Sequence, residues 1–381
     1  MPDSNDEDVL RKLLGRETIS LDEEGIRHGV EGRMYLITGA AGSIGSELCR
    51  RVGDLGARRV VLLDHAESDL FSADQEIRRR HPDLDVVSVL ADIRDARSVD
   101  HAVGAHPVDA ILHAAAYKHV PMMERHVVEA AHNNIIGTWN LVQAARRHGV
   151  GDFLMISSDK AVRPASVMGA SKRAAELVVS SGSGSVPGTR CASVRLGNVM
   201  GSRGSVVPAF REQIAAGGPV TVTHPEARRF FMSAREAALL ILEASTLGDE
   251  SGVFVVDMGQ AVRILDLAHT MIRLRGLVPG ADIEVRITGL RPGEKLIEDL
   301  VLDSETVEPT RDPRVRICRS SGVPPDVIGE FVRDLMSSIR VRDAARVVLC
   351  LRELVPEYRP GSGVEARPGR PVRASQVSAG P

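Results

Sequence analysis

Three evenly spaced glycines near the start of the chain lie between an apolar run and a helical pattern. Tyr35-Leu36-Ile37-Thr38 is typical of a buried strand, Gly39-Ala40-Ala41-Gly42-Ser43-Ile44-Gly45 follows it, and residues 46–52 continue as a helix. Glycine allows the tight turn and lets the backbone approach a pyrophosphate, which accepts hydrogen bonds from the amides that begin the helix. The sequence therefore predicts a strand–turn–helix unit that binds a dinucleotide. Its predicted contact residues are Gly39, Gly42, Ser43, Ile44 and Gly45.

Further apolar runs recur at helix-length intervals after this unit. They cover residues 60–64, 86–90, 110–113, 153–156 and 191–195. Strands that are separated by crossover helices form a parallel sheet. The predicted fold class is therefore α/β, a Rossmann-type doubly wound parallel sheet with a smaller C-terminal substrate-binding lobe.

Residues 1–33 are charged and form a predicted N-terminal arm. Val9, Leu10, Leu13 and Leu14 lie at helical spacing within it. This apolar stripe has no obvious place in a Rossmann core. We therefore expect the arm to pack on a neighbouring subunit, in a homo-oligomer that is a dimer or larger.

The rest of the chain divides into a core, a lobe and a tail. Residues 34–196 form the predicted NAD-binding Rossmann domain, with a later return near 229–258. Glycine and proline become frequent after Gly197, so residues 197–355 are expected to form mainly the substrate lobe. Residues 356–381 are rich in Pro, Gly, Ser and Arg without periodicity, and are expected to be disordered.

Acidic residues at strand ends indicate which cofactor the loop binds. Asp64 ends the second strand, where a carboxylate can bind both ribose hydroxyls and repels a 2′-phosphate. This favours NAD over NADP. Asp92 and Ile93 follow the third strand and are predicted to contact the adenine; the alternative for Asp92 is a helix N-cap.

Composition excludes several classes of protein. The net charge is −3 and there is no basic block, which argues against a nucleic-acid partner. No apolar run approaches the ~18 residues of a membrane span, and the acidic N-terminus is unlike a signal peptide. The four cysteines lack the spacing of a zinc or disulfide site, so we expect no metal and a cytoplasmic location.

Lysine is rare in this chain. Of 48 Lys and Arg residues only five are lysines: Lys12, Lys118, Lys160, Lys172 and Lys295. The last four stand in motifs, and lysine, unlike arginine, can lose its proton near neutral pH. Codon bias is the alternative explanation.

A second cluster of reactive residues follows the fifth strand. Ser157-Ser158-Asp159-Lys160 lies where the fold would bring a nicotinamide, and Lys172 falls on the next helix. Short-chain dehydrogenases carry a tyrosine base four residues before such a lysine, but here that position is Met168, which cannot move a proton. Asp159 and Lys160 instead supply an adjacent acid and base, which suits an elimination. A strand-end ion pair, and a methionine that only fills the core, are the alternatives.

These motifs together resemble the extended branch of the short-chain dehydrogenases. Within it the chain is similar to the UDP-N-acetylglucosamine 4,6-dehydratases of the capsule and polysaccharide biosynthesis family, from about Leu10 to Leu300. The larger members carry a membrane domain ahead of the catalytic part and share the methionine; we expect this chain to be a form without that domain. The segments that carry the resemblance are residues 39–45, 113–124, 133–138, 158–162, 168–173, 195–199 and 290–295.

The resemblance implies a particular reaction on a UDP-sugar. NAD takes hydride from C4 of the sugar and returns it to C6, which gives a 4-keto-6-deoxy sugar. Lys160 abstracts the C5 proton while Asp159 protonates the departing 6-hydroxyl. Ser158 would hydrogen-bond the 4-oxygen, and Lys172 would hold the nicotinamide ribose. The resemblance also implies cofactor contacts from Ala114 and Ala115.

The same resemblance indicates the residues that bind the UDP-sugar. They are Lys118, Asn198, Arg229, Arg291 and Glu294. Arginine suits a pyrophosphate, although Arg229 and its neighbour Arg228 could be surface charges. Other activities stay open: a UDP-sugar 4-epimerase, a dehydratase that inverts C5 or stops at a 5,6-alkene, and a non-catalytic NAD-sensing protein.

Overall fold

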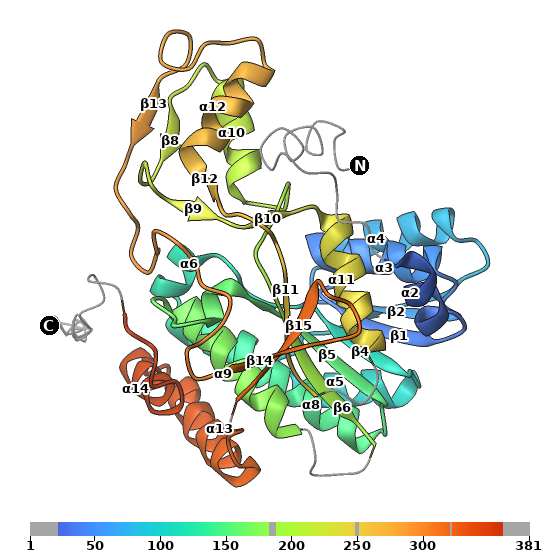
Figure 1. Ribbon diagram of the computed structural model, residues 1–381. Helices are drawn as coiled ribbons and strands as arrows, with labels where there is room; N and C mark the ends of the chain where they lie inside the picture. Colours follow the sequence, from blue (N-terminus) through green and yellow to red (C-terminus); the bar gives the residue numbers. More distant parts are fainter. Residues whose placement is uncertain (1–21, 183–187, 248–250, 321, 361–381) are drawn as a thin grey trace, which may run out of the picture.

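A nine-stranded sheet runs through the centre of the molecule in the order β14-β15-β11-β6-β5-β4-β1-β2-β3 (Figure 1). The computed structural model describes residues 22–182, 188–247, 251–320 and 322–360. From β3 to β11 all neighbouring strands are parallel, whereas β15 is antiparallel to both β11 and β14. The strands are β1 (Met34–Thr38), β2 (Arg59–Asp64), β3 (Asp85–Leu90), β4 (Ala110–His113), β5 (Asp152–Ser158), β6 (Arg190–Leu196), β11 (Gly252–Val256), β14 (Thr306–Pro309) and β15 (Val315–Arg319). The predicted Rossmann-type α/β fold is confirmed.

Helices cover both faces of this sheet, which explains why its central strands are almost wholly apolar. One layer contains α2 (Glu23–Val30), α3 (Ser43–Asp54), α4 (Glu67–Arg80) and α11 (Ala234–Thr246). The other contains α5 (Ala96–Ala105), α8 (Gly137–Arg147) and α9 (Val167–Gly182). Three short elements precede α8: α6 (Val120–Arg125), α7 (Val127–Ala131) and the π-helical turn η1 (His132–Ile136).

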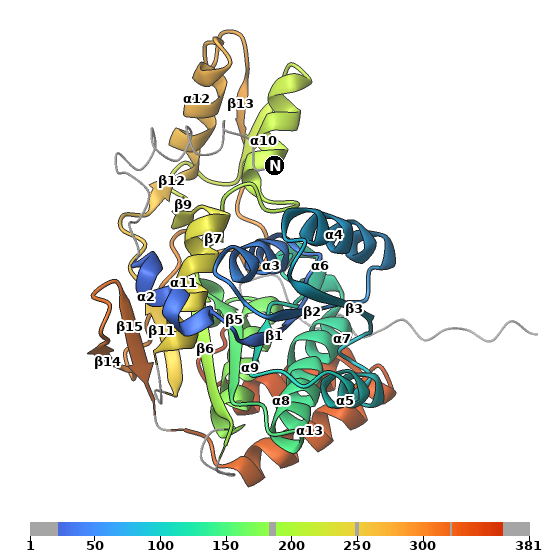
Figure 2. The ribbon, with the colours of Figure 1, turned by 90° about the vertical axis from the view of Figure 1, so that its right-hand side faces the viewer.

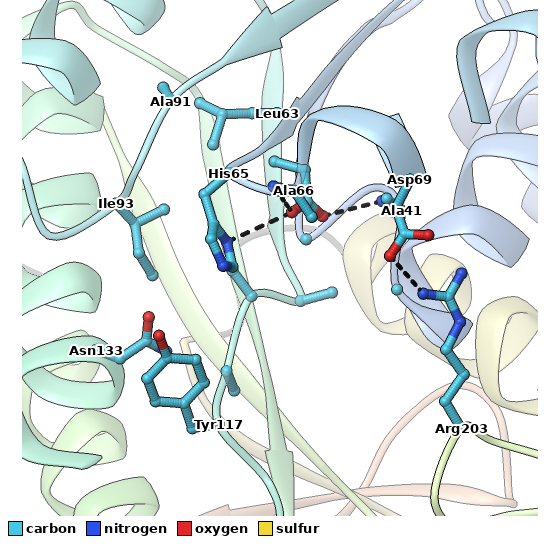
Figure 3. A pocket seen from close by; sticks show the side chains of 16 residues that line it. Ala41, Leu63, His65, Ala66, Asp69, Ala91, Ile93, Tyr117, Asn133 and Arg203 are labelled. Atoms are coloured by element: carbon cyan, nitrogen blue, oxygen red, sulfur yellow. Dashed lines mark hydrogen bonds and ion pairs between the residues drawn. The ribbon is translucent and has the colours of Figure 1, made fainter. Parts of the chain in front are cut away.

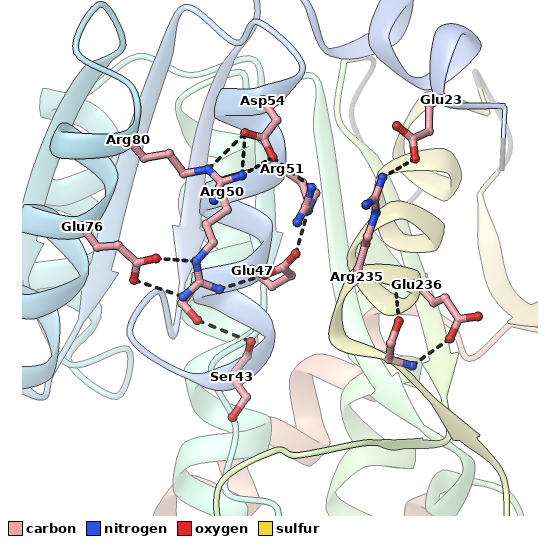
Figure 4. Close-up of polar contacts among 12 residues, drawn as sticks. Glu23, Ser43, Glu47, Arg50, Arg51, Asp54, Glu76, Arg80, Arg235 and Glu236 are labelled. Atoms are coloured by element: carbon pink, nitrogen blue, oxygen red, sulfur yellow. Dashed lines mark hydrogen bonds and ion pairs between the residues drawn. The ribbon is translucent and has the colours of Figure 1, made fainter. Parts of the chain in front are cut away.

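Ion pairs connect the helices of the first layer (Figure 4). Glu47 is 3% exposed and lies 2.8 Å from Arg50 and 2.7 Å from Arg51, on its own helix α3. Arg50 also contacts Glu76 of α4 at 2.7 Å. These ion pairs hold α3, the helix that follows the glycine loop, against α4.

The helix α2 lies in the predicted N-terminal arm but packs into the core of its own chain. Ile26 and Val30 are fully buried, and a Cβ on Gly29 would lie 2.3 Å from Cγ2 of Thr246 in α11. The arm was expected to pack on a neighbouring subunit, whereas α2 packs within its own chain. Val9, Leu10, Leu13 and Leu14 lie outside the described residues.

A smaller lobe lies above the carboxyl ends of the parallel strands (Figures 1 and 2). It has its own apolar cluster, which includes Phe210, Val222 and Leu267. Its elements, with the short pairs that join it to the core, are β7 (Asn198–Val199), α10 (Val206–Ala215), β8 (Val220–Val222), β9 (Arg228–Arg229), β10 (Phe231–Met232), β12 (Val262–Arg263), α12 (Ile264–Leu274) and β13 (Val285–Ile287).

The chain after the lobe returns to the core, which differs from the expectation that residues 197–355 belong mainly to the lobe. β14 and β15 extend the sheet, and α13 (Pro325–Arg340) and α14 (Ala344–Leu354) pack on α7 and α9. The expected tail also begins later, because Tyr358 is 1% exposed and the amide of Arg359 donates to the carbonyl of Pro164 at 3.0 Å. Residues 361–381 lie outside the described part.

Two kinds of feature are absent from the described residues. None of the helices in this part of the chain is both long and apolar enough to cross a membrane. Among the same residues no group of three or more His, Cys, Asp or Glu side chains is arranged to hold a metal ion. All four cysteines are buried free thiols.

Candidate active site

The glycine loop has a conformation that larger residues could not adopt. Gly39 has a φ of +63°, and a Cβ there would lie 2.8 Å from the backbone of Ala115. A Cβ on Gly45 would lie 2.0 Å from the carbonyl oxygen of Gly39. The helix α3 begins after Gly42 without a side-chain cap, so its first amides can receive an anion.

A cavity of about 250 Å³ opens beside this loop, between the ends of β1, β2 and β4 (Figure 3). This is the point where the strand order reverses and where such sheets bind ligands. The predicted residues that line it are Gly39, Gly42, Asp64, Ile93, Ala114 and Ala115. Ser43, Ile44, Gly45, Asp92 and Lys172 lie outside this lining. His65, Tyr117, Asn133 and Arg203 line it without having been predicted.

Asp64 joins the end of β2 to the glycine loop. One carboxylate oxygen accepts from the amide of Ala41 at 3.1 Å and the other from the amide of Ala66 at 3.0 Å. His65 Nδ1 lies 3.5 Å from the same carboxylate. Asp64 is therefore fixed at the cavity wall by backbone donors.

Asp92 has a different environment from the one predicted. Its carboxylate binds the Arg94 guanidinium at 2.6 Å and accepts from the Arg94 amide at 2.9 Å. The hydrogen bond from Arg94 lowers the pKa of Asp92. The N-cap of α5 is Asp95, so the N-cap alternative for Asp92 is wrong, and its contact with the adenine stays a prediction.

Arg203 reaches from the lobe to the helix that follows the glycine loop and to α4. Its amide donates to Ser43 Oγ at 3.2 Å, and its guanidinium donates to Asp69 at 2.6 Å. The side chain is exposed at the cavity (Figure 3). Sequence reasoning missed it because nothing in an irregular segment indicates which distant loop it will meet.

His113 holds the strand end beneath Ala114 and Ala115. Its ring lies between the hydroxyls of Thr38, at 2.7 Å, and Thr138, at 2.9 Å. Burial, with a smaller effect of the Lys172 charge, lowers the pKa of His113 to about 3. The imidazole is therefore neutral and structural.

Ser158, Asp159 and Lys160 gather with Asn198 where β5 ends and the 3-10 turn η2 (Asp159–Ala161) begins. Ser158 Oγ donates to Asp159 Oδ1 at 2.9 Å, and Lys160 Nζ donates to the same oxygen at 2.9 Å. Lys160 also donates to Asn198 Oδ1 at 3.3 Å. Asp159 is fully buried, and its Oδ2 has no hydrogen-bond partner among the described residues. The structure thus brings a hydroxyl, a carboxyl and an amine into one contact group.

Glu298 adds a carboxylate to this group that the sequence analysis missed. Its Oε1 lies 3.8 Å from Lys160 Nζ, and Lys295 Nζ lies 3.9 Å from its Oε2. Burial raises the pKa of Glu298. It lies just beyond the segment that ends at Lys295, in a stretch without helical or strand periodicity.

Lys172 and Met168 lie one turn apart on α9, behind the reactive group. Lys172 Nζ donates to the carbonyl of Ile156 at 2.7 Å, and burial lowers its pKa to about 8. Met168 is 3% exposed within an apolar cluster. A buried thioether at this place supplies no proton donor or acceptor of ordinary strength.

Three of the predicted substrate residues, Arg229, Glu294 and Arg291, contact one another through Glu294. Arg229 is 5% exposed; it donates to the carbonyls of Lys295 and Leu296 at 2.8 and 3.0 Å, and to Glu294 at 3.3 Å. Glu294 also accepts from Arg291, whose side chain is 59% exposed. Arg229 therefore supports the loop that presents Glu294 and Arg291.

Lys118 lies exposed on the loop after β4.

A Rossmann sheet with this glycine loop and a Ser-Asp-Lys group at the end of β5 defines an extended short-chain dehydrogenase fold. The chain belongs to the polysaccharide biosynthesis protein family, whose model matches residues 35–320.

Relatives agree with this assignment. The chain is 45% identical to the capsular polysaccharide biosynthesis protein CapD of Staphylococcus aureus, over 77% of this chain and 49% of CapD. It is 42% identical to the probable polysaccharide biosynthesis protein EpsC of Bacillus subtilis, over 84% of this chain and 54% of EpsC. The chain thus spans about half the length of these relatives. It is also 34% identical to the UDP-glucose 4-epimerase of Rickettsia canadensis, over 71% of this chain and 77% of the epimerase.

Solved structures show the same fold. Pen from Bacillus thuringiensis superposes with a TM-score of 0.70 at 29% identity, over 80% of this chain and 98% of Pen. UDP-glucose 4-epimerase of Thermus thermophilus, in complex with NAD, superposes with a TM-score of 0.62 at 23% identity, over 70% of this chain and 90% of the epimerase.

Proposed function

We propose that the chain catalyses the NAD-dependent dehydration of UDP-N-acetylglucosamine to a UDP-4-keto-6-deoxy sugar. The observation that carries this proposal is the contact group of Ser158, Asp159 and Lys160, with Met168 where a tyrosine base would otherwise lie. An enzyme that only moves hydride needs one acid–base residue. A buried carboxyl and an amine 2.9 Å apart suit a reaction that removes one proton and delivers another.

The residues around the cavity fit a dinucleotide. The glycine loop can pack closely on itself and on Ala115 only because Gly39 and Gly45 carry no Cβ, and Asp64 lies at the cavity wall, where it can accept from ribose hydroxyls. When bound there, NAD supplies hydride acceptance at C4 and hydride return at C6. Ala114 and Ala115, which line the cavity, would contact it, and a negative Asp64 would disfavour the 2′-phosphate of NADP.

The protein's own residues would then handle the protons. Ser158 hydrogen-bonds the 4-oxygen of the sugar and can pass its proton to Asp159, which already accepts from Ser158 at 2.9 Å. Once C4 is a ketone, the C5 proton is acidic and Lys160 removes it. Asp159 gives its proton to the 6-hydroxyl, which leaves as water. Lys172 holds the end of β5 through the carbonyl of Ile156 and lies near the nicotinamide ribose in this scheme.

For the UDP moiety we propose the loop that Arg229 supports. Arg291 is exposed and can bind the diphosphate, and Glu294 can accept from the uridine ribose. Asn198 orients Lys160, and Lys118, on the loop after β4, is a further proposed contact of the UDP-sugar. The UDP-sugar is the partner that we propose, together with a second copy of the chain.

A UDP-sugar 4-epimerase is the second candidate, because a UDP-glucose 4-epimerase is among the relatives that are more than 30% identical. Incubation with UDP-N-acetylglucosamine in D₂O, followed by NMR, separates the two. A dehydratase forms a 6-methyl product with deuterium at C5. A C4 epimer with an intact 6-hydroxyl and protium at C5 would instead establish the epimerase.

A further inference from the structure

Glu298 is a buried carboxyl group beside Lys160 that has no part in the mechanism above. The residue is 5% exposed, and its Oε1 lies 3.8 Å from Lys160 Nζ. Within the described part of the chain its Oε2 is buried without a hydrogen-bond partner. A carboxylate in such a place is costly unless an opposite charge or a proton compensates it.

The backbone around Glu298 is held in place from two directions. Arg229 donates to the carbonyls of Lys295 and Leu296, at 2.8 and 3.0 Å. On the other side Lys295 Nζ donates at 2.8 Å to the carbonyl of Val162, which directly follows η2. These hydrogen bonds fix the segment of backbone that carries Glu298, whose carboxylate lies beside Lys160.

The proposed dehydration requires a proton acceptor besides Asp159 and Lys160. Lys160 donates to Asp159 and to Asn198, and the ordinary ammonium form of a lysine has no lone pair with which to accept a proton. An ammonium cannot take the C5 proton. Asp159 cannot accept the proton of Lys160 in this step, because after oxidation at C4 Asp159 already carries the proton that it delivers to the 6-hydroxyl.

We propose that Glu298 accepts the proton of Lys160 and so converts that side chain into the amine that abstracts the C5 proton. This inference rests on the dehydration proposed above. Glu298 is a positioning and relay residue, since it acts through Lys160.

Protons balance through the cycle. The C4 hydroxyl proton passes through Ser158 to Asp159, and the Lys160 ammonium passes one proton to Glu298. Lys160 then takes the C5 proton, while Asp159 gives its proton to the 6-hydroxyl, which leaves as water. After hydride has reached C6, Lys160 returns a proton to C5 and Glu298 returns its proton to Lys160. The group ends with the protons with which it began.

The charged groups around Glu298 permit this exchange. Burial raises its pKa; the Lys160 charge opposes the rise, the Asp159 charge adds to it, and Arg229 and Lys295 oppose it. The pKa of Glu298 is therefore closer to neutral pH than that of an exposed glutamate. As long as the Lys160–Glu298 pair holds one shared proton, the fraction of Lys160 in the amine form does not change with bulk pH.

The test is the pH dependence of elimination in Glu298→Gln. Stopped-flow NADH absorbance on mixing with NAD and UDP-N-acetylglucosamine reports oxidation at C4, and NMR in D₂O reports exchange at C5 and product. Wild-type elimination should be flat between about pH 6 and 8. In Glu298→Gln, NADH should still form, whereas elimination should fall about tenfold or more at low pH and recover about tenfold per pH unit, because Lys160 must now lose its proton to water.

Asp299→Asn is the matched control. Asp299 is the next residue, is 38% exposed on its side chain, and pairs with Arg163 at 2.9 Å and with Lys295 at 3.7 Å. It should keep the flat profile. Glu298→Asp retains a carboxyl group and should restore a flat profile at a reduced rate.

Other results would overturn the inference. A flat profile in Glu298→Gln, or an equal loss at every pH together with a lower thermal midpoint and no rescue by Glu298→Asp, would make Glu298 structural. Wild-type protein that forms no ketone would remove the proposed dehydration itself and the inference with it. If the wild type forms the dehydrated product and Glu298→Gln has the same pH profile as the wild type, the proposed dehydration stands and only the inference about Glu298 is wrong.

Discussion

At the scale of single residues, Lys160 is the side chain on which most of the proposed chemistry depends. Its amine lies between Asp159 at 2.9 Å and Glu298 at 3.8 Å, while Asn198 accepts from it at 3.3 Å. An arginine here would keep its proton through any accessible pH. The rarity of lysine in the chain and the use of lysine at this position are consistent with that requirement.

Replacing Lys160 with methionine should separate oxidation from elimination. Ser158, Asp159 and Lys172 remain, so hydride transfer from C4 should still occur in a fraction of molecules. The ketone is then stranded because no amine takes the C5 proton. We expect bound NADH absorbance, no solvent deuterium at C5, and product formation reduced by ~10²-fold or more at every pH. Wild-type exchange at C5 in this variant would show that another residue is the base.

Replacing Asp64 should change cofactor choice. Asp64→Ala removes a charge at the cavity wall and two acceptors of backbone amides, so NAD should bind about tenfold or more weakly, as expected for lost hydrogen bonds to a charged group. NADP should lose less, since its phosphate is no longer repelled. Calorimetric titration with both cofactors measures this. Asp64→Asn is the control, because it removes the charge and keeps an acceptor. Equal losses for both cofactors would refute the assignment.

At the scale of elements, a buried cluster of charges joins α9, β6 and the chain that returns from the lobe. Glu176 of α9 contacts Arg195 of β6 at 2.8 Å and Arg173 at 2.9 Å, and Arg195 contacts Glu305 at 2.7 Å. Ser157 of β5 donates to Glu176 at 2.6 Å, one residue before Ser158. The cluster therefore fixes the strand end that carries the reactive group.

This cluster should make the protein sensitive to acid. Burial alone would raise the pKa of Glu176, but Arg195, Arg173 and Ser157 lower it to about 2. Because the folded pKa is below the ordinary value of 4.5, this stabilisation is full above about pH 4.5 and is lost as the pH falls toward 2. It amounts to roughly 3 kcal/mol.

Glu176→Gln tests this account by chemical denaturation at several pH values. The variant should be about 3 kcal/mol less stable at neutral pH, because Arg195 and Arg173 lose a buried partner. Its further loss of stability between about pH 5 and 3 should be smaller than in the wild type. Glu330→Gln, on an exposed residue of α13, should behave as the wild type. Identical acid profiles for all three proteins would contradict the prediction.

The elements that sequence could predict are those whose signal is local. The strands β1, β2, β4, β5 and β6 are buried on both faces and contain mainly apolar residues, and the loop at Gly39 is marked by its glycines. Glu298 and Arg203 have no such local signal, because each is far in the sequence from the residues that it contacts, Lys160 and Ser43 respectively. β14 and β15 were missed for a related reason: they have only four and five residues, and polar or charged residues interrupt their apolar ones.

At the scale of the whole molecule, both ends of the described chain pack on the Rossmann core. The helices α13 and α14 cover α7 and α9, and Tyr358 is buried behind them. At the other end α2 lies on α11, where Glu23 contacts Arg235 at 2.7 Å (Figure 4). The lobe is thus the one large part of the described chain that stands off the core (Figure 2). A substrate that binds both the lobe and the end of β5 would be held between these two parts.

Two N-terminal deletions should separate assembly from stability. Residues 1–21 carry the apolar stripe at Val9, Leu10, Leu13 and Leu14, whereas residues 22–33 include α2, whose Ile26 and Val30 are fully buried. Removing residues 1–21 should lower the mass measured by light scattering and leave the thermal midpoint nearly unchanged. Removing residues 1–33 should in addition cost several kcal/mol, at about 1.5–3 kcal/mol for each buried aliphatic side chain. If the shorter deletion keeps the wild-type mass, the stripe does not contribute to an oligomer; if the longer deletion keeps the wild-type midpoint, α2 does not stabilise the core.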